Sequence, residues 1–167
     1  RFQEGHALVR MGFPDDLLEQ ARHLATLERP GRPRQASLRR AVSTAYYALF
    51  HLLVEDATRN WRRAAQRGAL ARAFEHGNMK KVCEQVRAEF ARRPTSPLAT
   101  RLSLVAEAFV DLQQKRQKAD YDSETRWPRT TAIAAIDSAE AAFEAWRAIR
   151  DEPEAQDFLL ALLVKRR

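Results

Sequence analysis

Apolar residues recur three and four positions apart over long stretches of this chain, and stretches that favour strands are few. Ala, Leu, Arg and Glu, which favour helices, dominate these stretches. The pattern predicts helices over about 14–28, 35–58, 69–75, 78–92, 98–120 and 129–150, with a terminal helical segment after Pro153 and a polar loop or helical turn at 60–68. We therefore expect an all-α protein, an antiparallel bundle of about five main helices joined by short connections.

The predicted boundaries rest on residues that start or stop helices. Gly77 is expected to end the short helix, and Asn78 to cap the next one. Pro94 and Pro97 are expected to break the chain again. Pro128 is expected at the first position of the following helix, because a proline ring suits that position.

The helical spacing also predicts which side chains are buried. The expected core residues are Leu17, Leu18, Ala21, Leu24, Ala25, Leu38, Ala41, Val42, Ala45, Leu49, Leu52, Leu53, Met79, Val82, Val86, Phe90, Leu102, Val105, Phe109, Leu112, Ile133, Ile136, Ala139, Phe143 and Trp146. We expect an N-terminal segment of uncertain order at 1–13, the bundle at 14–150 and a C-terminal helical extension at 151–167. The apolar residues of 158–163 are expected to pack on the bundle or on a partner.

Length, cysteine content and apolar runs narrow the class of protein. The chain has 167 residues, which suits one domain with its own core. The single cysteine, Cys83, cannot form an internal disulfide, so we expect a reducing compartment, the cytoplasm. The longest apolar run, 158–164, is far shorter than the roughly 20 residues that span a bilayer, so no membrane is expected.

The net charge is +7, and only five of the 29 basic residues are lysines, at positions 80, 81, 115, 118 and 165. The planar guanidinium of arginine suits phosphate groups, which makes RNA a candidate partner. Scattered arginines on solvated helix faces would give the same total, so charge alone leaves both interpretations open.

A polar stripe follows the predicted second helix. Arg40, Thr44, Tyr47 and His51 are spaced at i, i+4, i+7 and i+11, which places them on one face. A guanidinium beside an imidazole could hold a phosphodiester while the imidazole moves protons near neutral pH. The alternative is a buried polar network that fixes the register of the helix.

A second candidate lies near the end of the predicted helix 98–120. Arg116 and Asp120 are four residues apart and share a face, with Tyr121 slightly rotated from it. By spacing alone, an exposed ion pair at a helix end explains them better, and only the combination with the polar stripe of the second helix favours a site.

The sequence contains no motif for a metal site, a phosphate-binding loop or a nucleophilic serine. His6, His23, His51, His76 and Cys83 take no close metal-ligand spacing, and no glycine-rich phosphate loop or nucleophile elbow occurs. We therefore expect neither a metal nor a cofactor. Trp61, Trp127 and Trp146 stand apart from one another, so packing in a core or interface is expected for each rather than a base-stacking surface.

Two segments together resemble a family. The run 40–51, RAVSTAYYALFH, resembles the R…YYA.FH helix of HEPN-domain proteins, and 116–122, RQKADYD, resembles the R..ADYD segment of one HEPN branch. Between them, 74–76 (FEH), followed by 79–82 (MKKV), is similar to the start of that branch's central helix. The resemblance covers about residues 15–150.

The resemblance implies a bundle of four or five helices that dimerises, is often encoded beside a nucleotidyltransferase-type partner, and in several branches is a metal-independent ribonuclease toxin. In those branches the active motif is an Arg followed after four to six residues by a His, brought together across the dimer interface. Counted from Arg116, that His would fall at Tyr121, Asp122 or Ser123. A phenol, with an ordinary pKa of about 10, is a poorer proton shuttle than an imidazole.

Three hypotheses follow. In the first, a ribonuclease of a toxin-antitoxin or defence system, Arg116 holds the phosphate, Asp120 orients Arg116, and Tyr121 or His51 assists the attack. The residues expected to contact nucleic acid are Arg39, Arg40 and Tyr47. In the second, the chain is a non-catalytic homodimeric module that binds a partner protein such as a nucleotidyltransferase. In the third, arginines at 39, 40 and 116 bind phosphates as a helper of a nucleotidyltransferase.

Overall fold

The computed structural model describes residues 12–92 and 96–165, and it contains helices but no strand within those residues. The helices are α1 (Phe13–Thr26), α2 (Gln35–Arg59), α3 (Ala64–Ala71), α4 (His76–Phe90), α5 (Pro97–Tyr121), α6 (Arg129–Ile149) and α7 (Pro153–Leu163). The predicted all-α class is therefore confirmed. Five of these helices have 14 residues or more, in keeping with the five main helices expected.

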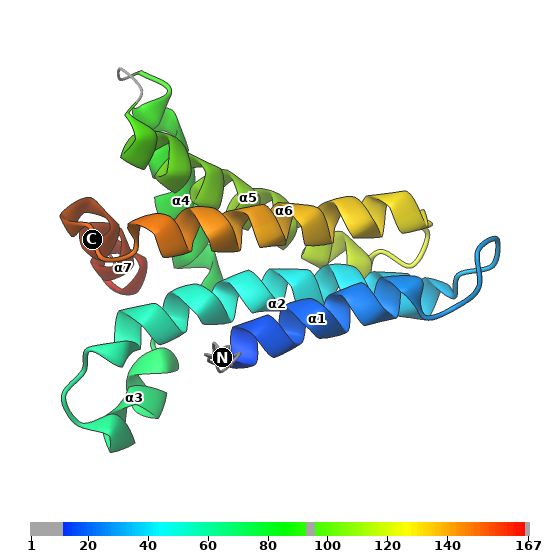
Figure 1. Ribbon diagram of the computed structural model, residues 1–167, viewed down its shortest axis with the longest axis horizontal. Coiled ribbons are helices and arrows are strands. Elements are labelled where there is room, and N and C mark those ends of the chain that lie inside the picture. Colours follow the sequence, from blue (N-terminus) through cyan, green and yellow to red (C-terminus); the bar gives the residue numbers. More distant parts are fainter. Residues whose placement is uncertain (1–11, 93–95, 166–167) are drawn as a thin grey trace, which may run out of the picture.

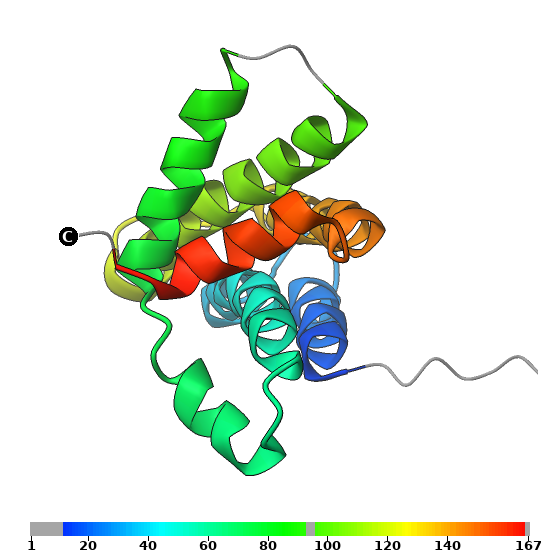
Figure 2. The same ribbon diagram turned by 90° about the vertical axis from the view of Figure 1, so that its left-hand side faces the viewer.

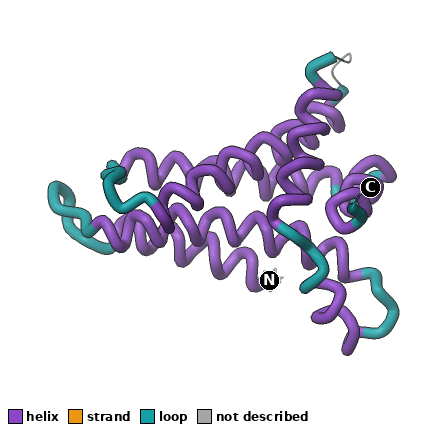
Figure 3. Tube along the Cα trace, turned by 180° about the vertical axis from the view of Figure 1, so that it is seen from behind, coloured by secondary structure: helices purple, strands orange, loops and turns teal. Residues whose placement is uncertain are grey.

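The long helices α1, α2, α5 and α6 form the body of a helical bundle. Figure 1 shows α1 and α5 running opposite to α2 and α6. Helix α2 packs against α1, α5 and α6, and it buries more side chains than any other described helix. Helices α4 and α7 contact each other and cover one end of the bundle (Figures 1 and 2). Figure 3 shows the long helices from behind, where loops connect their ends.

Most of the predicted core is buried. Leu38, Leu49, Phe109, Ile136 and Trp146 have essentially no exposed surface. The exceptions are Leu17, Leu18, Leu24, Val82, Val86, Phe90 and Ile133, which are only partly buried and pack against the edge of the core.

The chain between α2 and α4 differs from the prediction. The polar stretch 60–68 contains the start of α3, which ends at Ala71, and the expected helix 69–75 does not form. Helix α4 begins at His76, so Gly77 lies inside its first turn instead of ending a helix. Asn78 does not cap the helix, because its amide donates to the backbone oxygen of Leu162 in α7 at 2.8 Å. Local capping rules could not reveal this tertiary partner.

The start of α6 also differs by one position. Pro128 is the residue before the helix, with extended backbone angles of φ −68° and ψ 148°, and not its first helical residue. The cause lies in the buried Trp127, whose backbone N–H donates to Gln35 Oε1 at 2.8 Å and whose backbone oxygen accepts from Gln35 Nε2 at 3.1 Å. This two-sided contact with the start of α2 keeps the chain extended up to Pro128.

The C-terminal segment packs on the bundle. Phe158, Leu159 and Leu162 of α7 are buried, and the Phe158 ring lies 6.0 Å from the Trp146 ring between centroids. These buried residues of α7 therefore belong to the same core as α2 and α6, whereas Leu160 is 61% exposed. The predicted segment 1–13 falls outside the described residues up to position 11, as do Pro94, His6 and the last two residues of the extension 151–167.

No helix in the described part of the chain is long and apolar enough to span a membrane. Cys83 is fully buried in α4, and this burial raises the pKa of its thiol well above the ordinary value.

Candidate functional site

Arg116 lies in a largely buried position against the aromatic side of α2. Only 11% of its side chain is exposed. Its guanidinium carbon lies 5.3 Å from the centre of the Tyr46 ring and 5.9 Å from that of Tyr47, within the range of cation–π contact. Its Nε atom is buried and has no hydrogen-bond partner in the described structure. An unpaired buried N–H costs free energy, so this guanidinium is not fully satisfied by the contacts of the fold.

Asp120 connects Arg116 to α2. Its Oδ2 lies 3.5 Å from Arg116 Nη1, and its Oδ1 accepts a hydrogen bond from the buried hydroxyl of Ser43. The i, i+4 pair predicted from the sequence is therefore present. Because Ser43 fixes the carboxylate, Asp120 can hold the guanidinium in place against the tyrosine rings.

His76 joins the same cluster from α4. The Tyr46 hydroxyl lies 2.6 Å from His76 Nδ1, and the His76 ring stacks on Phe50 with centroids 4.3 Å apart. Burial raises the pKa of Tyr46 well above its ordinary value, so its hydroxyl stays protonated and can donate. A neutral imidazole that accepts at Nδ1 carries its proton on Nε2.

His51 lies close by on α2. Its ring meets Phe13 edge-on at 5.0 Å and Phe50 at 5.3 Å between centroids. Burial lowers the pKa of His51. Burial also lowers the pKa of His76, and the charges of Arg116 and His51 lower it further. Both imidazoles are therefore predominantly neutral at pH 7.

These two histidines predict a stability that depends on pH. Their folded pKa values lie below the ordinary value of about 6.5, so the unfolded chain binds more protons in the window from about 6.5 down to the folded values. The two neutral histidines should therefore make their full contribution to the free energy of unfolding above that window. The free energy of unfolding should fall as the pH is lowered through the window. Urea denaturation at pH 8, 7, 6 and 5.5 measures this fall.

The substitutions His51→Gln and His76→Gln should each flatten this dependence. The comparison at pH 8, where both imidazoles are neutral, gives the packing cost of each substitution by itself. Glu55 acts in the opposite direction at lower pH, because burial and the charges of Asp56 and Asp15 raise the pKa of its carboxyl. A slope between pH 7 and 5.5 that is the same in both variants as in the parent would contradict this prediction.

Arg39 has a different environment from the other candidate arginines. Its Nη1 donates to the backbone oxygens of Ala119 and Asp122 at 2.9 and 2.6 Å, and its Nη2 to those of Ser123 and Thr125 at 3.2 and 2.6 Å. All four terminal N–H groups of this guanidinium are thus used at the end of α5, where helix carbonyls lack partners. Only Nε–H remains for a phosphate, so Arg39 is better placed to anchor the end of α5 than to bind RNA.

Substituting Arg39 should therefore lower stability. We expect Arg39→Ala to reduce the free energy of unfolding by about 2 kcal/mol, because it leaves several carbonyls without their charged donor. The adjacent Arg40 is exposed, and Arg40→Ala should change stability by no more than about 0.5 kcal/mol. Urea denaturation of both variants tests this contrast. Equal effects of the two substitutions would show that the hydrogen bonds from Arg39 to these carbonyls do not contribute measurably to the free energy of unfolding.

The remaining predicted site residues are spread more widely. Tyr47 and His51 are partly buried, Thr44 is buried, and Arg40 is exposed. Tyr121 is 81% exposed, and no contact joins it to Arg116 in the described structure. The structure thus brings Tyr47 and Asp120 into contact with Arg116, and His51 follows Tyr47 by one turn of α2. Arg39 is bonded to the backbone on either side of Asp120, while Arg40 and Tyr121 are exposed.

Tyr46 and His76 were not among the site residues predicted from the sequence. His76 lies 30 residues from Tyr46 along the chain, so no helical spacing could pair them. A signal was present in the segment Phe74–His76, which resembles the start of the central HEPN helix.

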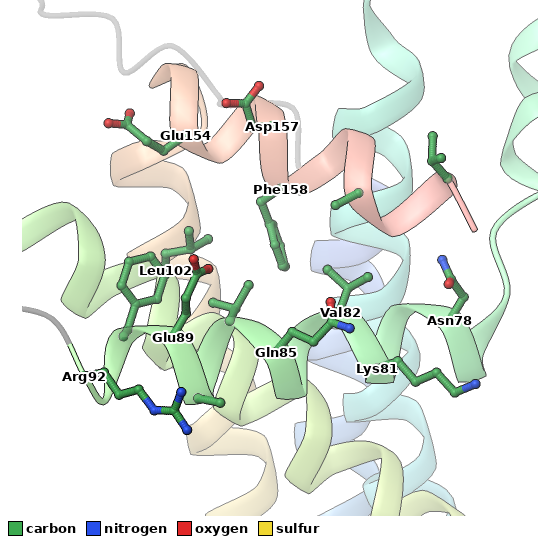
Figure 4. Close-up of a pocket in the computed structure, with 15 residues that line it drawn as sticks. Asn78, Lys81, Val82, Gln85, Glu89, Arg92, Leu102, Glu154, Asp157 and Phe158 are labelled. Carbon is green, nitrogen blue, oxygen red and sulfur yellow. The ribbon is translucent and has the colours of Figure 1, made fainter. Parts of the chain in front are cut away.

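A groove of about 760 Å³ lies between α4 and α7, apart from this cluster. Figure 4 shows Lys81 and Arg92 on the α4 side, Glu154 and Asp157 on the α7 side, and Phe158 pointing into it. None of the candidate site residues lines it. Within the described residues, no group of three or more His, Cys, Asp or Glu side chains is placed to hold a metal ion.

Three comparisons with known proteins complete the description of the site. No protein-family model matches the chain, and neither a curated protein nor a solved structure matches it.

Proposed function

We propose that this chain is a HEPN-like protein that cleaves RNA without a metal ion, at the cluster formed by α2, α4 and α5. The observation that supports this proposal is the cluster around Tyr46, whose ring contacts the largely buried Arg116 and whose hydroxyl lies 2.6 Å from His76 Nδ1. His51, a second imidazole of lowered pKa, lies against Phe50, on which His76 stacks. A fixed cation and a neutral imidazole that can take up a proton are groups that a phosphodiester transfer can use.

The chemistry is a transfer within the RNA strand. A neutral imidazole accepts the proton of the ribose 2′-hydroxyl, and the 2′-oxygen attacks the adjacent phosphorus. The bond from phosphorus to the 5′-oxygen breaks, and the imidazolium formed in the first step gives its proton to that leaving oxygen. The products are a 2′,3′-cyclic phosphate and a 5′-hydroxyl, and the step consumes no water.

The residues take the following roles. The Arg116 guanidinium neutralises the charge that develops on the phosphate oxygens, and Asp120 positions it. His51 is the imidazole that accepts and returns this proton, and His76, whose Nδ1 faces the Tyr46 hydroxyl, offers its Nε2–H as a hydrogen-bond donor to a phosphate oxygen. Tyr121 stands in solvent, which leaves it as a contact for the bound strand and not as a proton shuttle.

The biological setting in this proposal follows from the resemblance to HEPN proteins. The chain acts as a homodimer in the cytoplasm, as the toxin of a toxin-antitoxin or defence system, with a nucleotidyltransferase-like protein as its partner. Tyr47 and Arg40 face the RNA or the second subunit.

The test is RNA cleavage by the purified chain in the presence of EDTA. We expect cleavage that yields cyclic phosphate ends, and an oligonucleotide with one 2′-deoxy position should resist cleavage at that position. His76→Gln and His51→Gln should each reduce the rate. Activity that is equal in both variants and in the parent would indicate a contaminating nuclease and would overturn the proposal, as would the absence of cleavage.

The non-catalytic homodimeric module is the second candidate. It is favoured by Phe13 and Tyr121, two aromatic residues that are 53% and 81% exposed and that a partner surface could cover. In a non-catalytic module, the contacts of Arg116 with Tyr46 and Tyr47 would serve only to stabilise the packing of α5 on α2. A stable dimer in light scattering together with intact RNA after long incubation would favour it.

A further inference from the structure

The segment Trp61–Arg72, which includes α3, carries charges of one sign only. We call it the α3 arm. It contains four arginines, at positions 62, 63, 67 and 72, and no Asp or Glu. None of these arginines forms an ion pair with another residue of the described structure. The arm therefore carries four positive charges that the fold itself does not neutralise.

The arm also stands away from the body of the protein. Figures 1 and 2 show α3 off to one side of the long helices in two perpendicular views. No residue of α3 is buried. Arg62, Arg63 and Arg72 are exposed, while Leu70 and Ala71 are partly buried. The guanidinium groups of the arm are thus accessible to a large ligand.

Trp61 adds an aromatic surface to the arm. It is 49% exposed, whereas Trp127 and Trp146 are buried. Its indole N–H donates to Gln66 Oε1 at 3.0 Å, and its backbone oxygen accepts from Arg67 Nε at 3.0 Å. These two contacts within the arm hold the ring in place while part of it stays in solvent. Of the two environments expected for Trp61, core or interface, the core is therefore excluded.

Accessible arginines beside a half-exposed aromatic ring are suited to bind a single-stranded nucleic acid. Guanidinium groups bind phosphates along a strand, and an aromatic ring stacks on an unpaired base. A membrane surface fits less well, because an interfacial helix needs an apolar face and Trp61 is the only exposed large hydrophobic residue of the arm.

We propose that the α3 arm binds a single strand of RNA, with Trp61 stacked on a base and the arginines on flanking phosphates. The choice of RNA over DNA rests on the proposed ribonuclease function, and the binding itself does not depend on cleavage at Arg116. The arm would serve to hold the strand outside the site that cuts it.

Tryptophan fluorescence gives a direct test. Because the other two tryptophans are buried, stacking of a base on Trp61 should quench the exposed part of the emission when a single-stranded RNA oligonucleotide is added. Fluorescence anisotropy of a labelled oligonucleotide measures affinity independently. Trp61→Ala should weaken binding by about fivefold or more, and Trp61→Phe should restore most of it.

The arginines are tested by a matched pair of triple variants. Replacing Arg62, Arg63 and Arg72 by Gln should lower the slope of log affinity against log salt by about 0.7 for each phosphate that is no longer neutralised. The control replaces Arg34, Arg101 and Arg126 by Gln, which removes the same charge from exposed positions outside the arm. Equal effects of the two triple variants would overturn the proposal, since binding would then depend only on net charge.

The remaining outcomes are also decisive. Quenching by anionic vesicles but not by RNA would overturn the proposal in favour of a lipid surface. Equal quenching by single-stranded DNA would support the arm as a strand-binding element and remove the preference for RNA. The substitution Arg116→Ala should abolish cleavage and leave the quenching intact, so failure of the proposed ribonuclease and failure of the arm would give different results.

Discussion

Arg116→Ala should lower the rate of RNA cleavage by about 100-fold or more, which corresponds to about 2.7 kcal/mol of lost transition-state stabilisation. The reason is that the guanidinium is the cation at the centre of the cluster, largely shielded from water and positioned by Asp120. Shielding from water strengthens its interaction with the charge that develops on the phosphate. The measurement is the single-turnover rate on a labelled RNA oligonucleotide in EDTA.

Arg101→Ala is the matched control for this experiment. Arg101 lies on the same helix in an exposed position near its start, so its loss should leave the rate nearly unchanged. Arg116→Lys should recover only part of the rate, because an ammonium group lacks the planar fork that faces the Tyr46 and Tyr47 rings. Circular dichroism and thermal melting check that Arg116→Ala remains folded. If the folded Arg116→Ala variant cleaves RNA at the parent rate, Arg116 is not a catalytic residue.

The largest expected loss of stability comes from Trp146→Ala. The Trp146 side chain is fully buried, and its indole N–H donates to Asp56 Oδ2 at 2.7 Å. The substitution would leave a large cavity beside Phe158 and deprive a buried carboxylate of its donor. We expect the free energy of unfolding to fall by about 3–5 kcal/mol and the melting temperature by roughly 10 °C.

Trp61→Ala is the control for Trp146→Ala, because it makes the same chemical change at a half-exposed position. Its effect on stability should be well under half as large. Should Trp146→Phe cost as much as Trp146→Ala, the bond to Asp56 and not the packing of the ring would be the main contribution. A melting temperature of Trp146→Ala within about 2 °C of the parent would contradict the assigned packing.

Helix α2 carries both Asp56, which contributes to the stability of the bundle, and aromatic residues of the candidate site. Arg59 and Arg150 approach the Asp56 carboxylate at 3.5 and 3.7 Å. The aromatic residues of the site, Tyr46 and Phe50, lie further back along α2. Substitutions in either group should therefore be compared at equal folded fraction before rates are interpreted.

The helical content and most of the core could be predicted from the sequence. A spacing of three and four residues between apolar positions is a local property, and a helix expresses it directly as one buried face. Thus the predicted core residues from position 38 to 53 on α2 and from 136 to 146 on α6 are buried as expected. The i, i+4 pair of Arg116 and Asp120 was predictable for the same reason.

The composition of the site was predictable only in part. His76 reaches Tyr46 because α4 packs against α5 and begins at His76 beside α2, and no local spacing encodes that contact. Arg39 was selected for its charge, yet the end of α5 takes up its donors. Asn78 and Pro128 departed from their predicted capping roles because tertiary contacts, to Leu162 for the first and through Trp127 for the second, outweighed the local preference.

The sequence by itself determined that this chain is helical, which faces of its helices are buried and that arginine dominates its charge, because each of these depends on residues within a few turns of one another. The tertiary structure decided which arginine is shielded against aromatic rings, which is used to anchor a helix end and which stay free in the α3 arm. The first two roles depend on neighbours that lie 69 to 86 positions apart in the chain, and only packing brings them within reach.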